Sequence, residues 1–145
     1  MRWPRHVFVR TAEGQLTYGE AEARVAALAG GLRAAGVVPD RPVVIFMHNS
    51  LDQILAWFAL ARLGAVHVPI NNALVGSTLT HVFRVTGARL AIVDAELVPA
   101  LQAVRPDVPD LACIVVRGPV DPSGIDGEVV PFSDLAAGEP TSRPV

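Results

Sequence analysis

The chain has 145 residues, of which 51% are hydrophobic and 18% charged, with a formal net charge of −2. This composition is typical of a folded domain with a sizeable core and excludes a disordered chain. The nearly balanced charge, without a basic stripe, argues against nucleic acid and anionic membranes as partners. Because no apolar run reaches the roughly 18 residues of a membrane span and the N-terminus has no signal-peptide core, we expect a cytoplasmic protein.

The residues that most often bind metals are few and scattered. The single cysteine, Cys113, excludes an internal disulfide and a cysteine-cluster metal site, and its apolar neighbours predict an inert core thiol. The histidines have no metal-ligand spacing, so we predict no metal site. His67 alternates with apolar residues in a predicted strand, which favours a packed core or interface histidine over a catalytic base.

The first part of the chain predicts a hairpin followed by a long helix. The Glu13-Gly14 pair is typical of a tight turn between two short strands. Thr17 and Glu20 have the spacing of a capping box, and Gly36 is suited to the helix end. The predicted ranges are 7–9 and 15–17 for the strands and 18–35 for the helix.

From residue 42 onward, β-branched runs alternate with helical patterns. This alternation predicts an α/β fold with a mainly parallel sheet and flanking helices. The run 65–70 is interpreted as a buried strand, although it contains Pro69. We expect one domain over 1–138 and a linker or tail over 139–145. The predicted strands are 42–47, 66–70, 89–93, 111–116 and 128–131, and the predicted helices are 50–63, 77–85, 96–104 and 133–137.

The helix predicted over 50–63 is apolar nearly all round, which places it at the centre of the core, covered on more than one side. Ser50 and Gln53 have the spacing of a second capping box. If Trp57 and Phe58 are fully buried, replacing either with alanine costs about 3–5 kcal/mol. Ser133 is expected to cap the last helix.

The residues alone reveal no complete active site. The dinucleotide motif GxGxxG, the phosphate loop GxxxxGK[ST] and the nucleophile elbow GxSxG are all missing. His48-Asn49-Ser50 follows a predicted strand, at the end of the sheet where ligands bind in open α/β folds, but helix capping by Ser50 is the simpler interpretation. Asp94 and Glu96 also follow a strand and are interpreted as solvated carboxylates.

Four stretches together resemble the start of the large N-terminal domain of the adenylate-forming superfamily. This superfamily includes acyl-CoA synthetases, luciferases and the adenylation domains of peptide synthetases. The stretches are LTYGEAEARVAALAGGLRAAGV, RPVVIFMHNS, ALARLGAVHVPIN and GARLAIVD, and the similarity covers about residues 7–135. The stretch NNALVGSTLTHVFRVTGARLAIVDAELVPAL looks most like acyl-CoA synthetases related to the crotonobetaine/carnitine-CoA ligases.

The resemblance implies a full enzyme that activates a small carboxylate with ATP and Mg²⁺, releases pyrophosphate and transfers the acyl group to CoA. It also implies a Ser/Thr/Gly-rich phosphate loop ending in lysine and a C-terminal lid with a catalytic lysine. All twelve Lys and Arg residues of this chain are arginines. We therefore predict an N-terminal fragment with no catalytic residue and no bound cofactor, inactive alone. The opening helix usual in the family is missing or replaced by MRWPRH.

The alternative is a non-catalytic binding or interaction module that docks a partner chain. An exposed apolar patch at the place of the missing sheet would favour the fragment, whereas a polar surface there would favour the module.

The resemblance further implies that the loop after GAVHVPIN lies near the entry of CoA. Some members of the superfamily carry a basic residue in this loop, but Ala73 occupies the matching position here. Asn71 and Asn72 are thus the only residues that we predict to lie near CoA. Alternatively, Pro69 and Asn71 merely end the strand and shape the turn.

Overall fold

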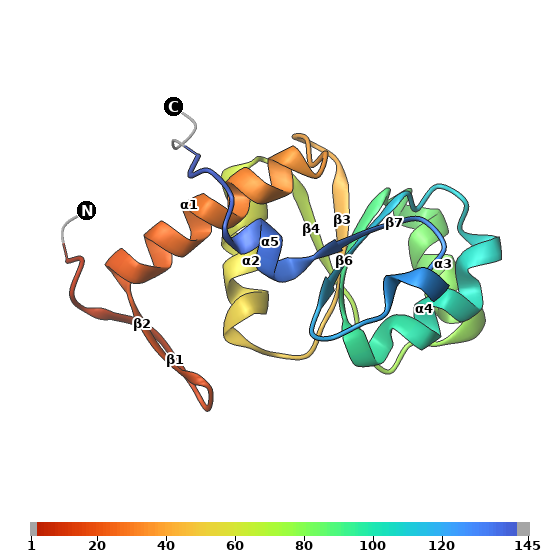
Figure 1. Cartoon of the computed structure of the whole chain (residues 1–145), viewed down its shortest axis with the longest axis horizontal. Coiled ribbons are helices and arrows are strands. Elements are labelled where there is room, and N and C mark those ends of the chain that lie inside the picture. Colours follow the sequence, from red (N-terminus) through yellow and green to blue (C-terminus); the bar gives the residue numbers. More distant parts are fainter. Residues whose placement is uncertain (1–2, 142–145) are drawn as a thin grey trace.

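A five-stranded parallel sheet, of order β4-β3-β5-β6-β7, forms the centre of the computed structural model, which describes residues 3–141 (Figure 1). A two-stranded antiparallel hairpin precedes it. The α/β prediction is confirmed. The hairpin consists of β1 (Val7–Thr11) and β2 (Gly14–Thr17), and the sheet of β3 (Pro42–Phe46), β4 (Val66–Pro69), β5 (Leu90–Asp94), β6 (Cys113–Arg117) and β7 (Glu128–Pro131). The helices are α1 (Tyr18–Ala34), α2 (Leu51–Arg62), α3 (Gly76–Thr86), α4 (Val98–Val104) and α5 (Phe132–Ala136), with 3-10 turns at Ala95–Leu97, Arg105–Asp107 and Pro122–Gly124.

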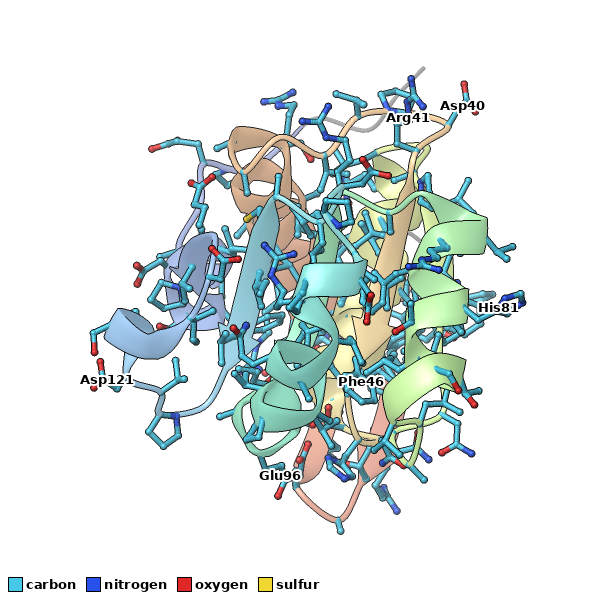
Figure 2. All side chains as sticks on the ribbon, turned by 90° about the vertical axis from the view of Figure 1, so that its right-hand side faces the viewer. Asp40, Arg41, Phe46, His81, Glu96 and Asp121 are labelled. Atoms are coloured by element: carbon cyan, nitrogen blue, oxygen red, sulfur yellow. The ribbon has the colours of Figure 1, made fainter. Side chains whose placement is uncertain are left out.

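Helices cover both faces of this sheet and divide the core into two clusters. Helices α1, α2 and α5 pack on one face and α3 and α4 on the other. In β3, Val43 and Ile45 belong to the first cluster and Val44 and Phe46 to the second, because successive side chains of a strand point to opposite faces. Figure 2 shows Phe46 in the interior and His81 on the outside. Burial on both faces explains why the inner strands are continuously apolar.

The predicted helix starts are largely confirmed. At α1, the hydroxyl of Thr17 accepts the N–H of Glu20 and the Glu20 carboxylate accepts the N–H of Thr17, which completes the capping box. At α2, the hydroxyl of Ser50 accepts the N–H of Gln53 at 3.1 Å. Among the described residues, only this half of the second capping box is present.

The prediction that residues 65–70 form a buried strand is wrong. Strand β4 is an edge strand that pairs with β3 alone, and Val66 is 48% exposed. The N–H groups of Val66 and Ile70 donate to carbonyls of the β3 segment, so the alternate positions 67 and 69 face outward. Pro69 lacks an N–H and therefore fits this outer edge without the loss of a hydrogen bond.

The prediction that α2 is covered on several sides is also wrong. Trp57 is 54% exposed and Phe58 41% exposed, so neither is a fully buried core residue. The helix buries one face only, against the sheet and α1. The buried residues on that face are Leu55, Ala56, Ala59 and Leu60.

Helix α5 begins earlier than predicted. Its N-cap is Pro131, without a side-chain hydrogen bond, so Ser133 lies inside the helix and does not cap it. Phe132 at the first helical position is 6% exposed and anchors this start in the core.

Residues after α5 lie along α1. The N–H of Thr141 donates to the carbonyl of Ala26 at 3.0 Å, and a Cβ at Gly30 would overlap the carbonyl oxygen of Glu139. Close approach here requires glycine in α1. The domain boundary at 138 stays a prediction, and residues 142–145 of the predicted linker lie outside the described residues. Within residues 3–141, none of the helices is both long and apolar enough to cross a bilayer.

Candidate functional site

Ionisable side chains at and just after the ends of three strands converge at the carboxyl edge of the sheet. Asp94 ends β5, Arg117 ends the neighbouring β6, and His48 follows β3. Glu96 lies in the 3-10 turn directly after β5 and Asp52 in the first turn of α2. Because the strands are parallel, their carboxyl ends meet at one edge, the usual place for ligands in open α/β sheets.

Asp94 is the centre of this cluster. Its side chain is 5% exposed. Oδ1 accepts Nε of Arg117 at 2.7 Å, and Oδ2 accepts Nη2 of Arg117 at 3.1 Å and the backbone N–H of His48 at 2.7 Å. Burial by itself raises the pKa of Asp94, but the hydrogen bonds from Arg117 and His48 outweigh it and hold this pKa below its usual value. The hydrogen bond to Asp94 likewise raises the pKa of Arg117, so both groups are charged at neutral pH.

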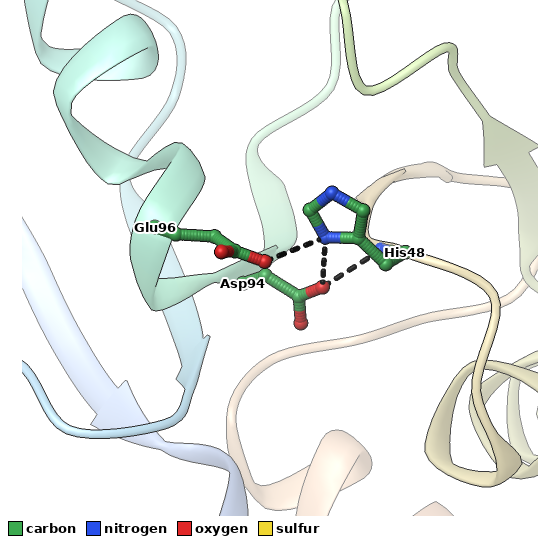
Figure 3. Close-up of side chains that lie close together, drawn as sticks. All are labelled: His48, Asp94 and Glu96. Atoms are coloured by element: carbon green, nitrogen blue, oxygen red, sulfur yellow. Dashed lines mark hydrogen bonds and ion pairs between the residues drawn. The ribbon is translucent and has the colours of Figure 1, made fainter.

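The imidazole of His48 faces two carboxylates through a single ring nitrogen (Figure 3). Its Nδ1 is 3.0 Å from Oδ2 of Asp94 and 2.9 Å from Oε1 of Glu96. The two carboxylates differ in environment, since the side chain of Glu96 is 71% exposed. The interpretation of Asp94 as a solvated carboxylate is wrong, because its side chain is buried and both of its oxygens accept hydrogen bonds from Arg117 in place of water.

The sequence places a charged residue at the end of each of two apolar strands, but it does not show that the two strands are neighbours. Asp94 and Arg117 end two apolar strands and occupy paired positions in the β5–β6 register. Only the order of strands in the sheet makes them neighbours.

The two asparagines predicted near CoA lie in the turn after β4. Oδ1 of Asn71 accepts the N–H of Ala73 at 2.8 Å, and its carbonyl accepts the N–H of Leu74 at 3.1 Å. Asn71 thus shapes the turn, as the alternative interpretation proposed. Asn72 is half-buried next to it. Their placement near CoA stays a prediction.

Comparison with known proteins identifies the family. A model of the AMP-binding enzyme family matches residues 1–142. The chain belongs to this family.

Relatives of this AMP-binding chain include CoA ligases and peptide synthetases. It is 31% identical to the 3-hydroxybenzoate–CoA ligase of Aromatoleum sp. over 129 residues, which are 88% of this chain and 25% of that protein. It is 41% identical to the feruloyl-CoA synthase of Amycolatopsis sp. over 105 residues, 70% of this chain and 21% of that protein. It is 35% identical to the phosphinothricin tripeptide synthetase PhsC of Streptomyces viridochromogenes over 96 residues, which are 66% of this chain and 9% of that protein. The chain therefore spans a quarter or less of the length of these relatives.

Solved structures share the fold. The anthranilate CoA ligase AuaEII in complex with anthranoyl-AMP matches with a TM-score of 0.87 and 24% identity, over 97% of this chain and 26% of that one. A putative long-chain-fatty-acid CoA ligase from Rhodopseudomonas palustris matches with a TM-score of 0.84 and 25% identity, over 98% of this chain and 35% of that one. These matches confirm the predicted fold of the N-terminal domain of adenylate-forming enzymes.

The AMP-binding family implies Mg²⁺, and His48, Asp94 and Glu96 offer ligand atoms within 4.8 Å of one another. The set does not fit that ion. Mg²⁺ prefers an octahedron of oxygens with several waters, whereas both oxygens of Asp94 already accept the guanidinium of Arg117. A divalent cation at Asp94 would lie beside the positive guanidinium of Arg117 and be repelled by it. The geometry is that of an ion pair and not of a metal centre.

The clefts at this edge do not fit the phosphates of ATP either. One cleft of about 540 Å³ is lined by residues 94–96 and 117–119, and a second of about 400 Å³ lies on the other side of Arg117. Arg117 is the cationic side chain in both linings. Its Nε and Nη2 contact Asp94, and Nη1 lies 3.5 Å from Asp52, so acidic partners already neutralise it. The cluster binds the ends of the strands together and leaves no free cation for a phosphate.

Proposed function

We propose that this chain is the N-terminal part of an ATP-dependent CoA ligase, which converts a small carboxylic acid through an acyl-adenylate into a CoA thioester in the cytoplasm. The observation that carries this proposal is the identity of 31% with a CoA ligase over 88% of the chain. The peptide synthetases support adenylate formation equally, because tyrocidine synthase 3 matches over 90% of the chain, but their identity is 29% there and 35% for PhsC, whereas the feruloyl-CoA synthase reaches 41% over 70% of the chain. CoA is therefore the acceptor that we favour over a carrier protein.

The proposed carboxylates follow from the relatives and from the earlier resemblance. Two relatives are named for 3-hydroxybenzoate and for the feruloyl thioester, both aromatic. The resemblance to crotonobetaine/carnitine-CoA ligases points to an aliphatic acid instead. Aromatic acids are our first choice because the relatives named for them align over more than two thirds of this chain.

Within this enzyme, we assign the chain a supporting role and no chemistry of its own. It contains no lysine, and Arg117 at the carboxyl edge is paired with two carboxylates. The phosphate loop, the catalytic lid and the ATP and Mg²⁺ sites would come from other residues of the enzyme. The 145-residue chain should then be inactive alone.

The experiment that tests this proposal begins with the reading frame beyond Val145. We expect it to encode a Ser/Thr/Gly-rich loop ending in lysine. The longer polypeptide should exchange pyrophosphate into ATP in the presence of 3-hydroxybenzoate, ferulate or crotonobetaine and should form the matching CoA thioester. The 145-residue chain should do neither. Exchange without thioester, together with acyl transfer to a carrier protein, would contradict the CoA assignment.

The proposed place of Asn71 and Asn72 near CoA has its own test. In the longer polypeptide, Asn72→Ala should raise the KM for CoA and leave pyrophosphate exchange unchanged, because exchange precedes the entry of CoA. Asn49→Ala, at an exposed asparagine that also follows a strand, is the control. Equal KM values for both variants would leave Asn72 without a role in CoA binding.

A second candidate function is a non-catalytic module that docks a partner chain. Connected aromatic rings on β1, α1 and α2, several of them exposed, favour a partner chain that covers them. A stop codon directly after Val145 would favour this module over the fragment.

A further inference from the structure

Five rings form a continuous strip over β1, α1, α2 and β4. The ring centroids of Tyr18 and Phe8 are 5.2 Å apart, those of Phe8 and Phe58 5.3 Å, those of Phe58 and Trp57 5.7 Å, and those of Trp57 and His67 5.6 Å. We call Tyr18, Phe8, Phe58, Trp57 and His67 the aromatic strip. Contacts between rings fix its shape and orient its members.

Much of the aromatic strip is exposed. Tyr18 is 45% exposed, Trp57 54% and Phe58 41%. Single exposed apolar residues are common on protein surfaces, but a connected series of large rings marks an interaction surface. Burial lowers the pKa of His67, so its imidazole is neutral at pH 7 and the aromatic strip carries no charge. The surface therefore suits an apolar partner.

Addition of a long strand beside β4 is disfavoured. Position 67 offers the only outward N–H among the residues of β4, because Pro69, the other outward position, has none. Side chains packed on the rings are therefore the favoured contact. Aromatic residues of this kind are enriched at the centre of protein interfaces.

Two observations indicate which partner this is. The solved relatives contain this same fold inside chains three to four times as long, since the chain covers 26% and 35% of them. Residues 138–141 lie against α1, on the face of the sheet that also bears α2. The last described residue, Thr141, thus lies on the same side of the sheet as α2, which presents Trp57 and Phe58.

We propose that the aromatic strip is the surface on which the remainder of the adenylate-forming fold packs. The inference rests on the proposed function, because it takes that remainder to exist. It goes further by naming the surface and the apolar character of what covers it.

A chimera tests this proposal. The chain replaces the matching segment of the 3-hydroxybenzoate–CoA ligase of Aromatoleum sp., and Trp57→Glu is compared in the chimera and in the 145-residue chain. Val85→Glu is the control, because Val85 is 70% exposed on α3, on the other face of the sheet. We expect Trp57→Glu to lower the melting temperature of the 145-residue chain only modestly, because a half-exposed ring loses its contacts with Phe58 and His67. In the chimera, the melting temperature should fall by several degrees more with Trp57→Glu than with Val85→Glu.

The outcomes separate this inference from the proposed function. Equal effects of both variants in a chimera that forms 3-hydroxybenzoyl-CoA would overturn the inference and leave the function intact. An inactive chimera whose melting temperature falls with Trp57→Glu would support the inference and overturn the proposed function. An insoluble chimera would count against the inference, since the strip would not fit the segment. A dimer of the 145-residue chain in sedimentation, dissociated by Trp57→Glu, would identify a second copy as the occupant and overturn the inference.

Discussion

Asp94 and Arg117 occupy paired positions at the ends of adjacent strands, with Nε of Arg117 2.7 Å from Oδ1 of Asp94. The same carboxylate accepts the backbone N–H of His48, and Arg117 extends the contact to Asp52. One ion pair therefore connects the ends of β3, β5 and β6 with the start of α2. The carboxyl edge of the sheet is held by charge at the point where apolar packing ends.

Replacement of Asp94 by alanine should destabilise the chain strongly. It removes the two hydrogen bonds of the partly buried Arg117 guanidinium and leaves it only the 3.5 Å contact with Asp52; complete loss of the partner costs about 3–5 kcal/mol at a fully buried site. Because the side chain of Arg117 is 25% exposed and water can reach it, we expect about 2–3 kcal/mol. Urea unfolding measures this. The control Glu96→Gln, at a side chain that is 71% exposed, should change the stability by less than about 0.5 kcal/mol. Similar losses in both variants would contradict the assigned importance of the ion pair.

The same ion pair should make stability depend on pH in the acid range. The pKa of Asp94 is lower in the folded chain than in the unfolded one, where an aspartate carboxyl has a pKa of about 3.9. Its contribution is therefore complete above the unfolded pKa and is lost as the pH falls through the folded pKa. The free energy of unfolding should fall below about pH 5. Asp121 and Glu20 also have lowered pKa values and add to this slope. The difference in the free energy of unfolding between wild type and Asp94→Ala reports on Asp94 alone. This difference should become smaller as the pH falls; a constant difference down to pH 2 would contradict the prediction.

Gly31→Ala should loosen the packing of α5 on α1. Alanine is favoured over glycine inside a helix by about 1 kcal/mol, but here the new Cβ would overlap the carbonyl oxygen of Leu135. Such overpacking costs about 1–3 kcal/mol, so we expect a net loss of stability. Hydrogen exchange of residues 132–141 should accelerate. Gly124→Ala, with open space around the added Cβ, is the control. A more stable Gly31→Ala variant would show that α5 shifts without cost.

Core aromatic residues should differ sharply from those of the aromatic strip. Phe46 is fully buried, so Phe46→Ala should cost about 3–5 kcal/mol. Trp57→Ala in the 145-residue chain removes a ring that is half exposed and should cost about 1 kcal/mol or less. Denaturant midpoints of the two variants measure the contrast. Comparable losses would mean that Trp57 is covered in solution, for instance by a second copy.

Local sequence signals predicted the elements of this fold well, and their limits have a physical cause. Thr17, Glu20 and Gly36 act within a few residues of the chain, so their effect on α1 can be deduced from the sequence alone. Burial depends on what lies across space. The apolar run of β4 and the rings of α2 predicted full coverage, but the order of strands places β4 at the edge.

The candidate site was less predictable for the same reason. Asp94 lies 23 residues from Arg117 and 46 from His48, and only the assembled sheet brings them together. Asn71 could be interpreted correctly as a turn residue because its bond to Ala73 is local.

Pro69 has a consequence for how this chain behaves before its surface is covered. An apolar edge strand with a full row of outward N–H groups is a template for fibril-like growth between copies. Strand β4 offers such a group at His67 and none at Pro69. Pro69 therefore interrupts this template at the β4 edge, next to the exposed rings, in the way that gatekeeper prolines do.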